Sequence, residues 1–248
     1  MSDFLIYAFL FFVGSLLGWV LELFFRHWFS SANPEHRWIN PGFCVGPYVP
    51  LYGFGLCILY TMATLLEDVE WSTATEVLAA LALIAVLMTL LEYIAGIFLL
   101  KVANVRLWDY SMLWGNINGL ICPLFTFFWT VLGVFYYFVI HPRILDALGW
   151  LSANLAFSFV IGFFYGVFML DVAYSIQLVA RVKKYADENQ LEIKYEEFKR
   201  HVYNKRLERD IKRRFFFSLP QKDKMREGLD SFRNSQRALR EQAKKLTQ

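Results

Sequence analysis

Five long apolar stretches dominate this chain. A helix needs about 20 consecutive, mostly apolar residues to cross a lipid bilayer. Stretches of that kind occupy residues 4–25, 48–66, 77–100, 120–140 and 154–178. Only 19% of all residues are charged, against about 25% in soluble domains. The sequence therefore predicts an all-α integral membrane protein with five transmembrane helices, and it excludes a soluble enzyme or a disulfide-rich secreted scaffold.

Charge divides the chain into two parts. Residues 1–180 hold 5 basic and 11 acidic side chains, whereas residues 181–248 hold 20 basic and 11 acidic ones. We therefore expect a transmembrane domain over 1–180 and a basic, helical cytoplasmic tail over 181–248.

The basic residues between the apolar stretches predict the orientation. Residues 26–47 and 101–119 each hold two, residues 67–76 hold none, and residues 141–153 hold only Arg143. Basic loops stay in the cytoplasm. This alternation places the N-terminus outside and the tail inside, in the cytoplasmic (inner) membrane, with 141–153 as an outer loop.

Two segments share an unusual pattern: an acid, a tryptophan 16 residues later, and then Gly-x-x-x-Pro-Leu-aromatic. They are Glu22, Trp38 and Gly46–Tyr52 in the first segment and Glu92, Trp108 and Gly119–Phe125 in the second. The pattern predicts a parallel internal repeat of two helical hairpins, over residues 4–66 and 77–140. The fifth helix, 154–178, has no counterpart.

The loop within each predicted hairpin is rich in glycine, proline and asparagine, yet apolar and aromatic. Proline and glycine interrupt helices. At membrane depth, irregular backbone is tolerated only inside protein or beside water. Two interpretations stay open: re-entrant segments that line a cavity open to the cytoplasm, or tight hairpins packed on the helix ends.

Three acids lie inside predicted spans, each toward the cytoplasmic end: Glu22, Glu92 and Asp171. A carboxylate within the bilayer is costly and indicates function by default. Arg26 stands four residues after Glu22 and can pair with it. The acids could bind a cationic substrate, carry protons, pair with a loop arginine, or extend toward the lipid headgroups.

The candidate substrate or ion site combines these acids with polar and aromatic residues of the hairpins. Its members are Glu22, Glu92, Asp171, Asp109, Asn118, Tyr52, Asn40, Trp108 and Arg37. No P-loop, zinc-protease or nucleophile-elbow motif occurs, and the four histidines are scattered. We therefore assign no catalytic residue and expect neither a metal nor a cofactor.

Two Gly-x-x-x-Gly pairs occur within the spans, Gly14 with Gly18 and Gly162 with Gly166. Small residues at this spacing allow helices to approach closely. We expect both pairs to mark helix-packing faces.

The tail is expected to continue the fifth helix over 172–188, break at 187–190 and resume as a charged helix over 192–214. A heptad seam then predicts a short coiled-coil segment over 222–246. Basic and aromatic residues at 212–217 favour contact with membrane lipids. The seam favours self-association or docking of a partner, and nucleic acid is not an expected partner.

Several of these motifs together resemble one family of bacterial polytopic membrane proteins, the CmpB-like ABC-transporter permeases. The resemblance covers residues 10–180 and rests on Gly18–Glu22, Asn40–Gly55, Trp108–Ser111, Asn118 and Gly119. The family's usual Asn-Arg-Gly-Phe reads Asn40-Pro-Gly-Phe43 here. The resemblance implies a permease component that works with a separate ATPase subunit.

Three functions remain open. The first is a permease-like transport component with a polar, acidic cavity near the cytoplasmic face, driven by a separate ATPase or an ion gradient. The second is a polytopic membrane enzyme that acts on a lipid or small amphiphile and uses the same acids for acid–base chemistry. The third is a membrane scaffold or sensor that recruits partners through its basic tail.

Overall fold

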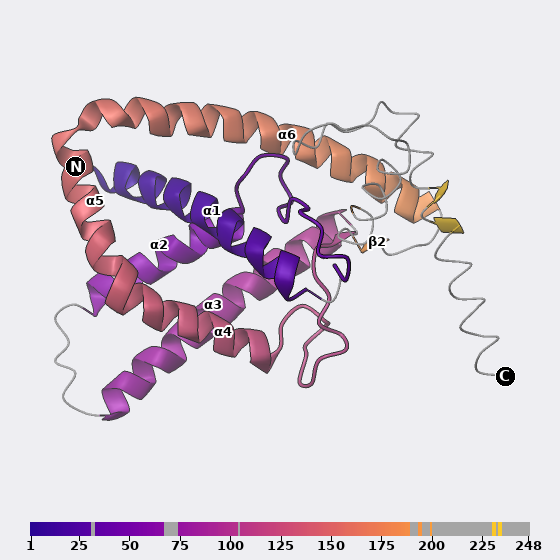
Figure 1. The fold of residues 1–248 in the computed structure, drawn as a ribbon, viewed down its shortest axis with the longest axis horizontal. Coiled ribbons are helices and arrows are strands. Elements are labelled where there is room, and N and C mark those ends of the chain that lie inside the picture. The colour runs from indigo at the N-terminus through magenta and orange to yellow at the C-terminus, as the bar shows by residue number, and fades with distance from the viewer. Residues whose placement is uncertain are drawn as a thin grey trace.

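The computed structural model describes residues 1–30, 33–66, 74–103, 105–188, 193–194, 199, 230–231 and 233–234. Within them the regular elements are helices, apart from one pair of two-residue strands, and irregular loops connect them (Figure 1). The helices are α1 Asp3–Trp28, α2 Pro50–Leu65, α3 Ala74–Ala103, α4 Pro123–Phe135, α5 His141–Ala153 and α6 Ser158–Glu188. A π-helical turn, Tyr136–Ile140, joins α4 to α5, and a 3₁₀ turn, Leu155–Phe157, precedes α6.

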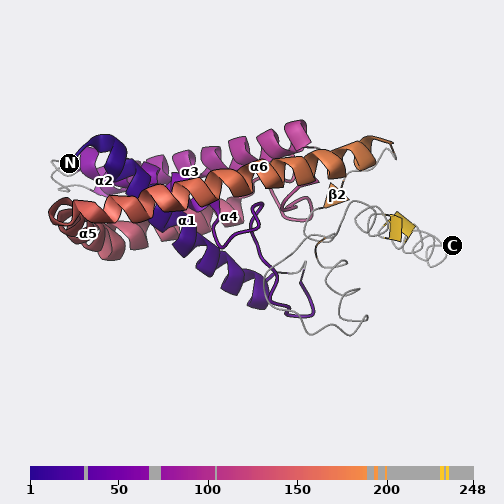
Figure 2. The same cartoon turned by 90° about the horizontal axis from the view of Figure 1, so that it is seen from above.

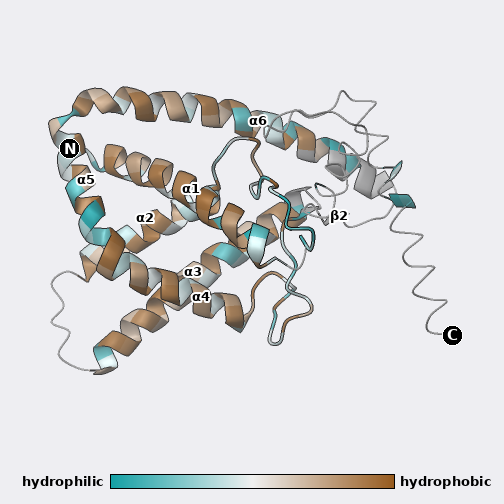
Figure 3. Ribbon diagram, in the orientation of Figure 1, coloured by the Kyte–Doolittle hydropathy of each residue, from teal (hydrophilic) through white to brown (hydrophobic). Residues whose placement is uncertain are grey.

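Among the described residues, four helical segments are long and apolar enough to cross a membrane, judged by length and composition. They are Asp3–Trp28, Ala74–Lys101, Pro123–Ala153 and Leu155–Leu178. The helix α2 is apolar but has only 16 residues. Apolar residues make up most of these helices (Figure 3), and many of them are exposed: Phe159 is 79% exposed and Leu170 is 75% exposed. Because so much apolar surface requires an apolar solvent, the chain is a multi-pass membrane protein.

The first helix packs closely on α2, and α3 packs on α4. A Cβ atom on Gly14 would stand 2.8 Å from the Cβ of Leu56, and one on Gly18 would overlap the ring of Tyr52. The first glycine pair is therefore a packing face, as expected. The second is not: a Cβ on Gly162 or Gly166 would meet no described atom within 4 Å.

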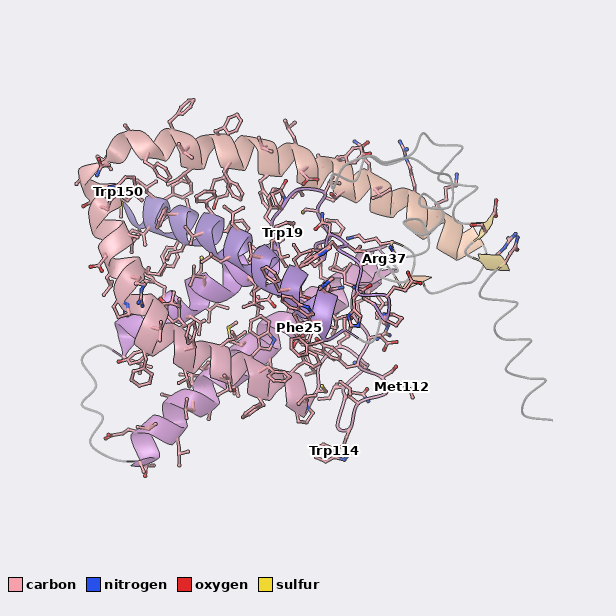
Figure 4. All side chains as sticks on the ribbon, in the orientation of Figure 1. Trp19, Phe25, Arg37, Met112, Trp114 and Trp150 are labelled. Atoms are coloured by element: carbon pink, nitrogen blue, oxygen red, sulfur yellow. The ribbon has the colours of Figure 1, made fainter. Side chains whose placement is uncertain are left out.

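The two hairpin loops lie at the same end of the helices as the C-terminal half of α6 (Figures 1 and 2). The N-terminus and α5 lie at the opposite end. Residues 141–153, predicted as an outer loop, instead form the helix α5, which runs at a steep angle to α6 (Figure 1). It buries Ile144, Leu148 and Leu151 against the helices, and its exposed Trp150 marks this end in Figure 4.

The last described helix, α6, continues to Glu188, so it reaches the predicted break at 187–190. Beyond it, the strand β2, Ile193–Lys194, pairs in parallel with β1, Val105–Arg106. The predicted tail helix 192–214 and the heptad segment 222–246 lie almost entirely outside the described residues.

Candidate functional site

Glu22 lies on α1, six residues before the helix ends at Trp28, and has two partners. Its Oε1 accepts a hydrogen bond from Arg26 Nε at 2.8 Å, the i, i+4 pair that the sequence allows. Its Oε2 accepts from the hydroxyl of Tyr52 at 2.7 Å. Pro50 is the first residue of α2, and Tyr52 lies in its first turn. The start of this helix therefore brings the Tyr52 hydroxyl to Glu22.

Glu92, on α3, is the most deeply buried of the described acids, with 3% of its surface exposed. Its Oε1 accepts from the hydroxyl of Tyr110 at 2.9 Å, and its Oε2 accepts from Trp129 Nε1 at 3.1 Å. Both donors are neutral, and among the described residues no basic side chain pairs with this carboxyl group. Glu22 is thus charge-compensated within its own helix, whereas Glu92 is not.

The two acids belong to one cluster. The rings of Tyr52 and Trp129, which hold one acid each, lie 5.2 Å apart. Burial raises the pKa of Tyr110 well above its usual value, and the charges of Glu92 and Glu22 raise it further. Tyr110 therefore stays a neutral phenol. We call Glu22, Arg26, Tyr52, Glu92, Tyr110 and Trp129 the acid cluster.

Further aromatic rings pack beside Tyr110 of the acid cluster. Phe125, near the start of α4, stacks on the ring of Tyr110 at 4.2 Å with an interplanar angle of 12°. Phe25, labelled in Figure 4, meets the edge of Phe125 at 6.1 Å. The acids are therefore flanked by aromatic side chains from α1, α2, α4 and the second hairpin loop.

Asp171, on α6, lies outside the acid cluster and serves the first hairpin loop. Its carboxylate accepts from the backbone amides of Val45 at 3.1 Å and Gly46 at 2.7 Å, and from the hydroxyl of Tyr48. Ser175 Oγ adds a fourth hydrogen bond at 3.1 Å. This acid fastens a loop to a helix and has no described contact with Glu22 or Glu92.

The predicted residues of the first loop take part in its internal structure. Asn40 accepts from Trp19 Nε1 at 2.9 Å and donates to the carbonyl of Val45 at 2.8 Å. The guanidinium of Arg37 bonds Glu35 at 3.2 Å and lies toward the loop end (Figure 4).

The predicted residues of the second loop also bond close by. Trp108 donates to the carbonyl of Leu120 at 2.8 Å. Asp109 lies 3.9 Å from Arg106, and Asn118 donates to Tyr93 at 3.0 Å while adopting a positive φ of 55°. At the tip of this loop, Met112 and Trp114 are 94% and 88% exposed and project away from the helices (Figure 4).

Of the nine predicted site residues, the structure brings Glu22, Glu92 and Tyr52 together. Arg26, Tyr110 and Trp129 complete the cluster, and none of the three is among the nine predicted residues. The position of Arg26 four residues after Glu22 is a usable sequence signal. The sequence carries no such signal for Trp129, because an aromatic residue within an apolar span cannot be told from one that faces lipid.

Such an arrangement can hold a positive charge. A carboxyl group buried beside neutral donors binds a proton or a cation, because an isolated buried charge is costly. The surrounding aromatic faces favour cations and apolar groups as well. Within the described residues no group of three or more His, Cys, Asp or Glu side chains could hold a metal ion.

The fold and the acid cluster define a class: a multi-pass helical membrane protein with paired acids at one end of two helical hairpins. Within that class, the chain belongs to the family described as "Putative ABC-transporter type IV", whose model matches residues 9–176. Membership supports a general transport-related role and association with other components of ABC systems. No curated protein and no solved structure matches the chain.

Proposed function

We propose that this chain is the membrane-embedded, permease-like component of an ABC transport system, and that the acid cluster is its substrate site near the cytoplasmic face. A separate subunit supplies ATP hydrolysis, since the sequence has no P-loop. The two hairpins form a duplicated core, with the tail in the cytoplasm of the inner membrane.

One observation carries the proposal of a substrate site. Glu92 is 3% exposed, is held by two neutral donors, and has no described basic partner. A purely structural acid in a membrane is expected to pair with a base, as Glu22 does with Arg26. The unpaired acid therefore indicates a transported species that supplies the missing positive charge, namely a cationic or amphiphilic cationic substrate or a proton.

The repeat supports the same site. When the hairpins are aligned, Glu22 corresponds to Glu92 and Tyr52 corresponds to Phe125, which lacks the hydroxyl. Tyr110 stacks on Phe125 and donates to Glu92 in its place. Each hairpin thus presents an acid held by a phenol, and a duplicated site of this kind suits a substrate that contacts both halves.

The experiment is purification of the full chain in its native lipids, followed by identification of everything that accompanies it. The proposal expects a stoichiometric P-loop ATPase, whose ATP hydrolysis falls when Glu92→Gln is introduced. Asp146→Asn, an exposed acid on α5, is the matched control and should leave hydrolysis unchanged. A retained lipid converted to a product, with no ATPase present, would contradict transport and favour the enzyme.

A further inference from the structure

The described part of the tail returns to both hairpin loops. Strand β2 pairs with β1 in the register Val105 with Ile193 and Arg106 with Lys194, just before the second loop. A few residues later Lys199, 7% exposed, donates to the backbone carbonyls of Asn40, at 3.0 Å, and Gly42 in the first loop. Lysine is almost never buried this deeply without specific partners. The contact is therefore a specific anchor.

The first loop is fastened on its other side by α6. Four hydrogen bonds converge on Asp171, three of them from Val45, Gly46 and Tyr48. Hydrogen bonds to a carboxylate are roughly twice as strong as those between neutral groups. Residues 40–48, which we call the strap, are therefore held between Asp171 of the membrane domain and Lys199 of the tail.

The strap is connected to Glu22 at both of its ends. At its start, Asn40 Oδ1 accepts from Trp19, which lies one turn before Glu22 on α1. At its end the chain enters α2, where Tyr52 donates to Glu22 at 2.7 Å. A shift of the strap therefore acts on α1 through Trp19, one turn from Glu22, and on Tyr52, which donates to Glu22.

We propose that Lys199 and Asp171 are positioning residues, and that through the strap they couple the cytoplasmic tail to the acid cluster. A partner that binds the tail and withdraws Lys199 releases one end of the strap and loosens the bond between Tyr52 and Glu22. The coupling itself is independent of transport; it rests on the proposed function only in taking the acid cluster to be the substrate site.

The strap carries its own reporter, Cys44, which is 1% exposed. Burial raises the pKa of this thiol to about 12; the charge of Asp171 also raises it, whereas the charge of Lys199 lowers it. Because the thiolate is the reactive form, Cys44 should react slowly while the strap is closed. Cys122, 3% exposed at the end of the second loop, is an internal control in the same molecule.

The experiment measures labelling of the full chain in membranes with a membrane-permeant maleimide, mapped by mass spectrometry of peptides. Lys199→Gln should speed the labelling of Cys44 about tenfold, the effect of losing a hydrogen bond to a charged group, although loss of its charge alone would raise the thiol pKa and slow labelling. Asp171→Asn should also speed it, through the same loss and through a lower thiol pKa. Cys122 should keep its rate. Lys199→Arg, which retains donors and charge, should restore slow labelling, and Lys184→Gln at an exposed position of α6 should change nothing.

Transmission to the acid cluster is measured in the same samples with a hydrophobic carbodiimide, which modifies accessible protonated carboxyl groups. Labelling of Glu22 should rise together with that of Cys44. The inference is overturned if Cys44 keeps its wild-type rate in either variant, if Cys44 and Cys122 accelerate together, or if Glu22 does not follow Cys44. Neither readout needs a substrate, so this failure is distinct from failure of the transport proposal.

Discussion

The difference between Glu22 and Glu92 is the most informative feature at the scale of single residues. Both lie near the loop end of the first helix of a hairpin, and both accept a phenol hydrogen bond. Among the described residues, only Glu22 has an arginine beside it. Glu92 has no described counter-charge, so a cationic substrate or a proton would neutralise its carboxylate.

Replacing Glu92 with glutamine tests that role directly. The amide keeps the size of the side chain and can still accept hydrogen bonds, but it binds neither a proton nor a cation through charge. Transport should fall to background while the amount of protein in the membrane stays normal. The measurement is uptake or ATP hydrolysis per unit of purified protein; full activity in Glu92→Gln would refute the role.

The two donors to Glu92 should matter for stability. Trp129→Phe and Tyr110→Phe each remove a hydrogen bond to a buried carboxyl group, which should lower the free energy of unfolding by about 1–3 kcal/mol. Tyr174→Phe removes a hydroxyl from an exposed position on α6 and is the control. Thermal unfolding in lipid nanodiscs gives the comparison, and equal stability of all three variants would argue against the described contacts.

At the scale of elements, the two Gly-x-x-x-Gly pairs differ: the pair on α1 packs against α2, whereas the pair on α6 packs against no described element. Gly18→Ala puts a methyl group into the ring of Tyr52, so α1 and α2 must separate. We expect a loss of about 1–3 kcal/mol, as for other overpacked cores. Gly166→Ala on α6 meets open space and should change stability by less than about 0.5 kcal/mol. Thermal unfolding compares the stabilities of the two alanine variants. Similar losses of stability in both would contradict the packing of α1 on α2.

The helix α5 shows what apolar length alone misses. Residues 141–153 are too polar for a span, which favoured a loop. Yet Ile144, Leu148 and Leu151 follow one another at intervals of four and three, the period of a helix with one buried face. The structure buries these three residues. Hydrophobic periodicity would have predicted this helix, which suits a position across the end of the membrane helices.

At the scale of the whole molecule, the sequence predicted what is local or compositional. Apolar length predicted the membrane helices, and the i, i+4 spacing indicated the pair of Glu22 with Arg26. Contacts between distant segments had no such signal: Trp129 reaches Glu92 across 37 positions, and Asp171 reaches Val45 across 126. Such contacts depend on how the helices pack, so the division of roles among the three acids emerged only from the fold.

The predicted orientation also belongs to this scale. Single cysteines at Asp146 on α5 and at Lys184 near the end of α6 should lie on opposite sides of the membrane. An impermeant maleimide added to intact cells should label the first and reach the second only after the membrane is opened. Labelling of position 184 in intact cells would reverse the orientation and place the acid cluster at the outer face.

The most direct test of the account asks whether the acid cluster holds a substrate. Native mass spectrometry of the full chain, released from its own lipids, would compare the wild type with Glu92→Gln and the control Asp146→Asn. If Glu92 belongs to a substrate site, the wild type and Asp146→Asn should retain a small cationic or amphiphilic molecule, and Glu92→Gln should lose it. Equal retention in all three proteins would contradict a substrate site at Glu92.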